Sequence, residues 1–411
     1  MEDSLQRPKA ERPAHVPPEL VREFDFYNIP GSSDDVHAAY HAIQAASPDI
    51  FWTPYNGGHW VAVRADDIEE IQRGGSRFSN RRVVLPKMPD SVPRQIPLEL
   101  DAPDLAHYRK PLVQAMMPSA INALEAGVRK VAIDTIERLV PLGECEFIES
   151  FAKVLPIHVF LDLVDLPLSD KDFLLGVADK CIRGRTTEDR VEATAELGEY
   201  LHKWIEQRRA NPGTDLLSNV VTSQIRGELI GYDEAMRYAT LILFGGLDTV
   251  ASMMGFVVNV LARHPEHRRK LLENLDDDAF MNNAVEELLR RHGVALTSRT
   301  ATHDFEFRSL AFLEGDMILP ANVFVGLDER RTPNSLSIDL EREKPSHAVF
   351  GNGAHACPGA ILARREIRIF LEEWLRRIPD FQIKPGTKPV FDTGMVSGVL
   401  ELWLSWPAAK S

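Results

Sequence analysis

Phe350-Gly351-Asn352-Gly353-Ala354-His355-Ala356-Cys357-Pro358-Gly359 is the stretch on which the interpretation of this 411-residue chain depends. Its paired glycines permit a tight bulge without Cβ atoms, which a flat group can approach closely. Cys357 follows the bulge and precedes a predicted helix over residues 360–377, whose free N–H groups favour a thiolate. Pro358 suits the first helical position, because its fixed φ is already helical. A thiolate held on such a loop beside an aromatic ring suits an axial iron ligand.

The pattern Phe-Gly-x-Gly-x-His-x-Cys-x-Gly resembles the cysteine-ligand loop of the cytochrome P450 haem-thiolate monooxygenases. The alternative is a buried structural cysteine in a turn, which the number of matched positions disfavours. The resemblance implies haem b (iron protoporphyrin IX) as cofactor, with Cys357 as the axial ligand of its iron. It also implies the family's fold, mainly α with small β-sheets: a triangular helical prism with a long central helix over the haem. The loop residues implied to contact the cofactor are Phe350, Gly351, Gly353, His355 and Gly359.

Composition bounds the class of protein. The net charge of −14 argues against nucleic acid as a partner. The three cysteines lie far apart, which predicts a reducing compartment and not a disulfide framework. The polar, proline-rich start holds no apolar signal region or membrane anchor, so the chain resembles the soluble bacterial members and is predicted to be cytoplasmic. We expect an extended arm over residues 1–30 and a single domain over residues 31–411.

Apolar periodicity predicts a largely helical chain. Residues 51–64 predict a β-hairpin around Asn56-Gly57-Gly58. Residues 78–100 read as a long loop, which by resemblance covers the substrate side of the haem. Asp101 and Asp104 are expected to cap the next helix. Further helices are expected over residues 34–46, 66–72, 120–140, 147–164, 169–181, 187–209, 233–263 and 279–291, and small sheets over 296–320 and 381–406, with a coil-rich meander at 327–345.

The longest predicted helix contains Gly245-Gly246-Leu247-Asp248-Thr249. Its polar residues favour a buried central helix over a membrane span. Adjacent glycines destabilise a helix, and we expect them to let the backbone open towards a small ligand. The family carries this pattern over its oxygen site, which implies that Asp248 and Thr249 deliver protons and that Arg183 gates Asp248. The alternative for the acid and hydroxyl is simple solvation of a kinked helix.

Further site residues are implied by the resemblance. Arg109, Arg299 and His355 are candidates to bind the haem propionates, since arginine forks suit carboxylates. Glu287 and Arg290, three residues apart on one helix face, resemble a buried structural pair; a surface ion pair is the alternative. Family members often add an arginine from the meander, where the aligned place here holds Ser337.

Within the family the likeness is greatest to the soluble bacterial camphor monooxygenase, through stretches such as 326–330, 363–367 and 378–381. Pro93 replaces a tyrosine that anchors a ketone there. We therefore expect a compact apolar substrate, a cyclic monoterpenoid of cineole or camphor type, hydroxylated with O2. The aligned pocket residues are Val84, Leu98, Leu241, Phe244, Ala295, Met395 and Val396.

Electrons are expected from a [2Fe–2S] ferredoxin and an NAD(P)H-dependent ferredoxin reductase, because 411 residues leave no room for a flavin domain. The predicted docking face is Arg109, Lys110, Lys344, Arg364 and Arg365, with scattered solvated charges as the alternative. Two other functions remain open at this point: a haem-thiolate gas sensor or carrier, and a peroxide-driven peroxygenase. The acid–hydroxyl pair disfavours both.

Overall fold

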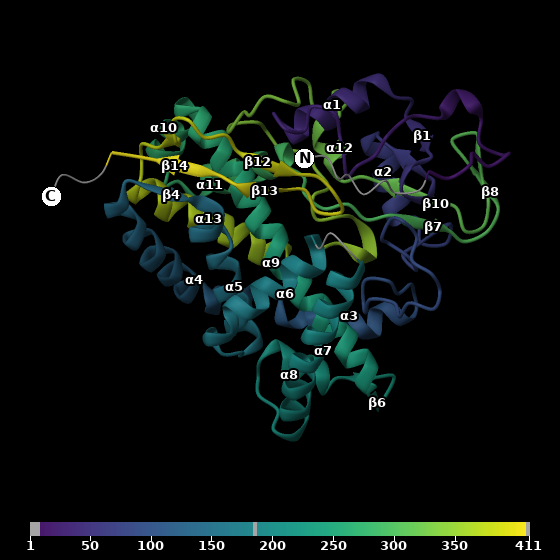
Figure 1. Ribbon diagram of the computed structural model, residues 1–411, viewed down its shortest axis with the longest axis horizontal. Helices are drawn as coiled ribbons and strands as arrows, with labels where there is room; N and C mark the ends of the chain where they lie inside the picture. Colours follow the sequence, from purple (N-terminus) through teal and green to yellow (C-terminus); the bar gives the residue numbers. More distant parts are fainter. Residues whose placement is uncertain (1–8, 184–186, 408–411) are drawn as a thin grey trace.

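The computed structural model describes residues 9–183 and 187–407 and confirms a mainly helical fold with small β-sheets. In Figure 1 the main sheet and the N-terminal part lie on one side of the molecule, α4, α5 and α13 lie on the other, and α9 runs between them. The helices are α1 Val36–Ala46, α2 Ala65–Arg73, α3 Asp104–Ala115, α4 Pro118–Leu139, α5 Val154–Val164, α6 Lys171–Arg183, α7 Thr187–Ala210, α8 Leu216–Val221, α9 Tyr232–Arg263, α10 Pro265–Glu273, α11 Asp278–Arg291, α12 Val323–Leu327 and α13 Ala360–Arg377.

The main sheet has the strand order β1-β2-β10-β7-β3, with β2 and β10 parallel and the other pairs antiparallel. It contains the predicted hairpin, and a smaller sheet has the order β11-β14-β4. The strands are β1 Ile50–Thr53, β2 His59–Ala62, β3 Phe78–Ser79, β4 Glu144–Glu146, β5 Gln224–Ile225, β6 Glu228–Leu229, β7 Arg299–Ala301, β8 Phe305–Phe307, β9 Leu310–Phe312, β10 Met317–Pro320, β11 Gln382–Ile383, β12 Val390–Asp392, β13 Gly398–Glu401 and β14 Trp403–Ser405.

Helix α9 belongs to two hydrophobic clusters. Its first half, from Ala235 to Leu243, packs with α5, α7 and α8. Its second half, from Val250 to Ala262, contacts α13 and β13 and belongs to the cluster that also contains the main sheet and α11. The helix is long and apolar enough to cross a membrane, yet most of its apolar window is buried inside the protein. Residues 245–249 therefore lie between the two clusters, where the sequence predicted the oxygen site.

Three local predictions need correction. Helix α3 is preceded by Pro103 without a side-chain cap, because Asp101 instead accepts hydrogen bonds from Ser79 Oγ and Asn80 N. Pro358 does not occupy the first helical position, since α13 begins at Ala360 and Pro358 lies in the turn before it. Helix α9 also does not open at its paired glycines, but continues through them as α-helix.

Candidate active site

The cysteine loop is a tight turn between the meander and α13. Gly351 and Gly353 have φ of 69° and 70°, a region that residues with a Cβ adopt at a cost. The loop closes on itself, because Cys357 N donates to Phe350 O at 2.7 Å. It is also docked on α2, where Asn352 Nδ2 donates to Gln72 Oε1 at 2.8 Å. The Cys357 thiol is thus held in a fixed position.

The electrostatics of Cys357 differ from the sequence-based expectation. The thiol is accessible to solvent, but enough protein surrounds it that burial raises its pKa. A hydrogen bond from Gly359 N–H and the positive charges of Arg109 and Arg364 act in the opposite direction and lower the pKa. The helix start therefore assists a thiolate without securing it, and a bound cation would supply the rest.

Three cationic or hydrogen-bonding side chains converge beside this loop. Arg109 on α3 donates to Ala356 O. Arg299 on β7 is almost fully buried, which lowers its pKa to about 10. Burial, followed by the charges of Arg299 and Arg109, lowers the pKa of His355 to about 4. These residues come from three separate elements, yet both arginines are close enough to His355 for their charges to lower its pKa.

This cluster fits the carboxylates of a haem. Arg299 Nε and His355 Nδ1 are buried and have no hydrogen-bond partner among the described residues. Such buried donors are unfavourable unless something accepts from them. Two propionate groups supply the negative charge and the acceptors that the cluster lacks. Arg109, Arg299 and His355 would hold the propionates of haem b, with Cys357 as the iron ligand.

One position in the middle of α9, Gly245, faces free space, whereas its neighbour Gly246 lies against the Phe160 ring. A Cβ built on Gly245 meets no atom within 4 Å. Thr249 Oγ1 donates to Gly245 O at 3.2 Å, and Asp248 is half-buried. Arg183, the predicted gate for Asp248, ends α6, but its side chain falls outside what the structure describes. The acid and hydroxyl therefore lie on a stretch of helix that a ligand can approach.

The seven predicted pocket residues share one property: each is apolar and only half-buried. Three of them lie side by side, because Ala295 and Val396 form a β-bridge and Leu296 N donates to Met395 O at 2.8 Å. Leu241 and Phe244 come from α9, just before the open face at Gly245. Ala295 and Met395 pack against one hydrophobic cluster and Phe244 packs against the other, so these side chains lie at the edges of the core, where a cavity lining is expected.

Glu287 and Arg290 form a buried pair on α11. Arg290 Nε and Nη2 donate to the two Glu287 oxygens at 2.7 and 2.8 Å, and both side chains have 0% exposure. A third arginine does join them, namely Arg342, whose Nε lies 3.1 Å from Glu287 Oε2. Ser337 contributes its carbonyl oxygen, which accepts from Arg290 Nη2 at 2.9 Å. The sequence comparison missed Arg342 because it lies five residues beyond the aligned place.

The predicted docking face is less uniform than expected. Arg364 is paired with Glu286, and its guanidinium lies 4.4 Å above the Phe350 ring. Arg365 is paired with Glu125. Lys110 and Lys344 are exposed and have no ion pair among the described residues. The lysines are therefore the cations of this face that remain available to a partner.

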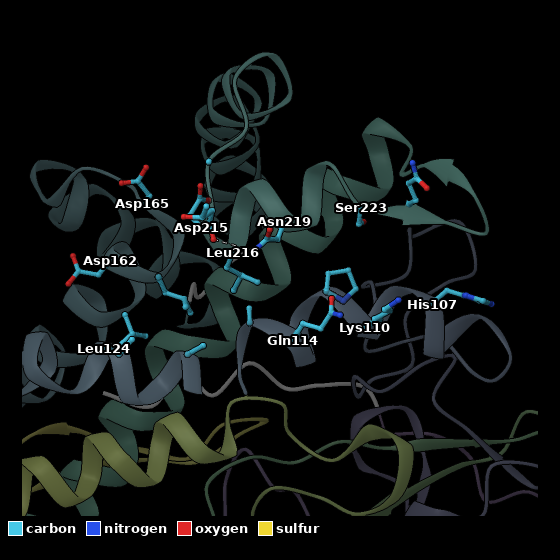
Figure 2. A pocket seen from close by; sticks show the side chains of 18 residues that line it. His107, Lys110, Gln114, Leu124, Asp162, Asp165, Asp215, Leu216, Asn219 and Ser223 are labelled. Atoms are coloured by element: carbon cyan, nitrogen blue, oxygen red, sulfur yellow. Dashed lines mark hydrogen bonds between the residues drawn. The ribbon is translucent and has the colours of Figure 1, made fainter. Parts of the chain in front are cut away.

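A groove of about 1050 Å³ lies between α3, α4, α5 and α8, outside the residues predicted from the sequence except for Lys110. Figure 2 shows His107 and Lys110 at one end and Asp162 and Asp165 at the other, so the two ends carry opposite charge. The residues that line the groove include none of the cysteine loop. The groove does not contribute to the site.

Known proteins show similarity to this chain in both sequence and structure. The family model described as "Cytochrome P450" matches residues 172–400. A probable cytochrome P450 127A1 of Sinorhizobium fredii is 35% identical, covering 96% of each chain. The mycinamicin IV hydroxylase/epoxidase of Micromonospora griseorubida is 28% identical, covering 86% of this chain and 91% of the relative.

Solved structures match along almost the whole chain. CYP101J2 superposes with a TM-score of 0.89 at 35% identity, covering 97% of this chain and all of the other. CYP101C1 gives a TM-score of 0.88 at 34% identity, with the same coverage. The predicted fold is confirmed, and relatives named as hydroxylases confirm the prediction of an oxidoreductase over a gas sensor.

Proposed function

The chain belongs to the cytochrome P450 family and is a haem b monooxygenase of the CYP101 type; on that premise we propose that it hydroxylates an unactivated C–H bond of a cyclic monoterpenoid. The bound haem supplies the oxidising chemistry through O2 and thiolate ligation. Cys357 is the proposed ligand. The observation that carries the proposal is that all seven predicted pocket residues are apolar and half-buried, two of them on α9 just before the open position at Gly245.

The pocket residues favour a small substrate without a polar anchor. Nearly all are aliphatic, and none offers a strong hydrogen bond, so binding depends on shape and on apolar area at about 25 cal/mol per Å². Phe244, on the helix that faces the free space, reduces the room for a steroid or a long acyl chain. Because Pro93 is exposed and has no hydroxyl, a ketone gains no bond there. Cineole is therefore expected to bind at least as well as camphor.

A panel of camphor, cineole, a fatty acid and a steroid tests this, read by the low-to-high spin shift and by coupled product. Cineole should give the largest shift. Phe244→Ala should improve the response to the larger compounds, whereas Phe173→Ala, at an exposed position, should change nothing. A stronger shift with the fatty acid or steroid in the unmodified enzyme would contradict the monoterpenoid assignment.

Asp248 and Thr249 are the proposed proton donors of the site. Thr249→Ala should keep NADH consumption while coupled product falls by at least about tenfold, because a positioned proton donor contributes that much or more. Thr240→Ala is the matched control, since Thr240 Oγ1 makes the same kind of bond to Met236 O on the same helix, at 2.9 Å. Unchanged coupling in Thr249→Ala would exclude this role.

The proposed electron donor is a [2Fe–2S] ferredoxin served by an NAD(P)H-dependent reductase, in keeping with a soluble, cytoplasmic protein. Such ferredoxins are acidic, and this chain is acidic overall, so docking requires a locally basic face. Lys110 and Lys344 support one beside the cysteine loop. Lys344→Glu should slow haem reduction, and the rate should fall steeply with salt. Arg365→Gln should have a smaller effect, because Arg365 is already paired. A rate independent of salt would contradict electrostatic docking.

A further inference from the structure

Two opposite charges are buried at the two ends of the loop that joins β3 to α3. The side chains of Arg82 and Glu99 are 3% and 4% exposed, and Arg82 Nη1 lies 3.7 Å from Glu99 Oε2. Burying two charges is unfavourable unless their remaining hydrogen bonds are made. A charged pair hidden in an otherwise irregular loop therefore needs a structural explanation beyond surface solvation.

The two side chains hydrogen-bond to the backbone of the loop that they close. Glu99 Oε1 accepts from Val83 N at 3.0 Å, and Glu99 Oε2 accepts from Gln95 N at 2.9 Å. Arg82 Nη2 donates to Pro89 O at 2.9 Å and to Val92 O at 3.0 Å. Together they replace the regular hydrogen bonding that the segment lacks.

The start of this loop is also hydrogen-bonded to the segment that leads into β7. Ser298 N donates to Val83 O at 2.9 Å, which joins the start of the loop to the strand that carries Arg299. Val84 follows these residues directly, and Leu98 directly precedes Glu99. Both are half-buried members of the predicted pocket lining. Glu99 therefore fixes the backbone at Val83, next to Val84, and is itself the residue next to Leu98.

We propose that Arg82 and Glu99 are positioning residues that fix Val84 and Leu98 and thereby determine which substrate C–H bond is presented for oxidation. This deepens the proposed function and rests on it for the identity of the pocket. Because a half-formed buried pair is strongly disfavoured, the loop closes as a unit. The pocket wall is therefore largely formed before substrate binds, and apolar shape alone can select an orientation.

Hydrogen exchange of the haem-loaded, substrate-free enzyme tests the pair without any assumption about substrate. Glu99→Gln leaves the buried Arg82 charge with the exposed Asp90, 3.6 Å away, as its one acidic partner among the described residues, so exchange in residues 83–98 should accelerate at least about tenfold. Asp134→Asn, which breaks the exposed Lys130–Asp134 pair, should leave the loop unchanged. Unchanged exchange in Glu99→Gln would overturn the proposal.

Product analysis tests the effect on specificity. With whichever compound of the panel gives the largest spin shift, Glu99→Gln should spread hydroxylation over more positions than the unmodified enzyme does. If the pair only stabilises the fold, Glu99→Gln would lower the melting temperature and leave the product ratio unchanged. That result would overturn the positioning role. If Glu99→Gln does not load haem, Arg82→Lys replaces it in both measurements. Lysine keeps the positive charge but lacks the guanidinium group that bonds Pro89 O and Val92 O. A different best substrate would contradict the monoterpenoid assignment alone.

Discussion

Pro358 removes one hydrogen-bond donor from the surroundings of the Cys357 sulfur. Proline has no N–H, whereas Gly359 N–H does bond to the sulfur. A Cβ on Gly359 would also lie 3.8 Å from that sulfur, so the turn brings the backbone close to it. Donors of this kind withdraw electron density from a metal-bound sulfur. The chain therefore presents a more electron-rich thiolate than a loop with both amides.

Pro358→Leu should raise the reduction potential of the haem iron by an amount on the order of tens of millivolts, since it adds a donor near the ligand. A redox titration of the haem-loaded enzyme measures this. Pro265→Leu makes the same substitution at the first position of α10 and should leave the potential unchanged. No difference between the two variants would mean that proline serves only the backbone conformation.

The pairing of α11 with the meander shows how one side chain can join several elements. Arg290 donates from Nη1 to Gly326 O and Ser335 O at 2.6 and 2.7 Å, in addition to its bonds with Glu287. A Cβ on Gly326 would lie 2.0 Å from Arg290 O, so only glycine allows this approach. Arg342 completes the group from the more exposed side, at 19% exposure.

Arg290→Gln should destabilise the protein by about 3–5 kcal/mol and reduce haem loading, because it leaves Glu287 buried without its main partner. Arg342→Gln should cost about 1 kcal/mol or less, as expected of a partly exposed pair. Thermal melting and the ratio of haem to protein provide the comparison. Equal losses in the two variants would contradict the ranking by burial.

Regular elements could be predicted from the sequence more fully than the contacts between them. Residues 360–377 were predicted as a helix, and α13 has the same bounds, because its apolar spacing is sustained over many turns. Arg342 and the Arg82–Glu99 pair lie in segments without periodicity, where only the folded path of the backbone decides which side chains meet. The residue spacing of the cysteine-loop motif likewise could not show that Pro358 lies outside the helix.

Across the whole molecule, two kinds of buried titratable group oppose each other. Burial raises the pKa of Glu366 to about 8 from its ordinary value of 4.5, so the folded state loses stability as pH rises from 4.5 towards 8. Burial lowers the pKa of His37 and His59 to about 3, so the folded state loses stability as pH falls below 6.5. Between pH 4.5 and pH 6.5 the two histidines add more stability with rising pH than Glu366 removes, so the protein should be most stable near pH 6.5.

Glu366→Gln should remove the loss on the alkaline side. Relative to the unmodified enzyme, the variant should gain about 3 kcal/mol between pH 4.5 and pH 7, and more by pH 8. The loss of stability at low pH should stay the same, because His37 and His59 are unchanged. Melting temperatures across this range measure the effect, with the exposed Glu273→Gln as control. A constant difference between Glu366→Gln and the unmodified enzyme at every pH would rule out the titration.

The order of strands in the main sheet constrains how the protein can be made. β2 pairs with β10, which follows it by more than half the chain, and the cysteine loop docks on α2 through residues 280 positions apart. A ribosome delivers the N-terminal hairpin long before its partner strand exists. The β1–β2 pair can form early, but the other edge of β2 must wait unpaired for β10 until most of the chain has been made. Haem can therefore bind only late in synthesis. The need for chaperones should be greatest just before that step.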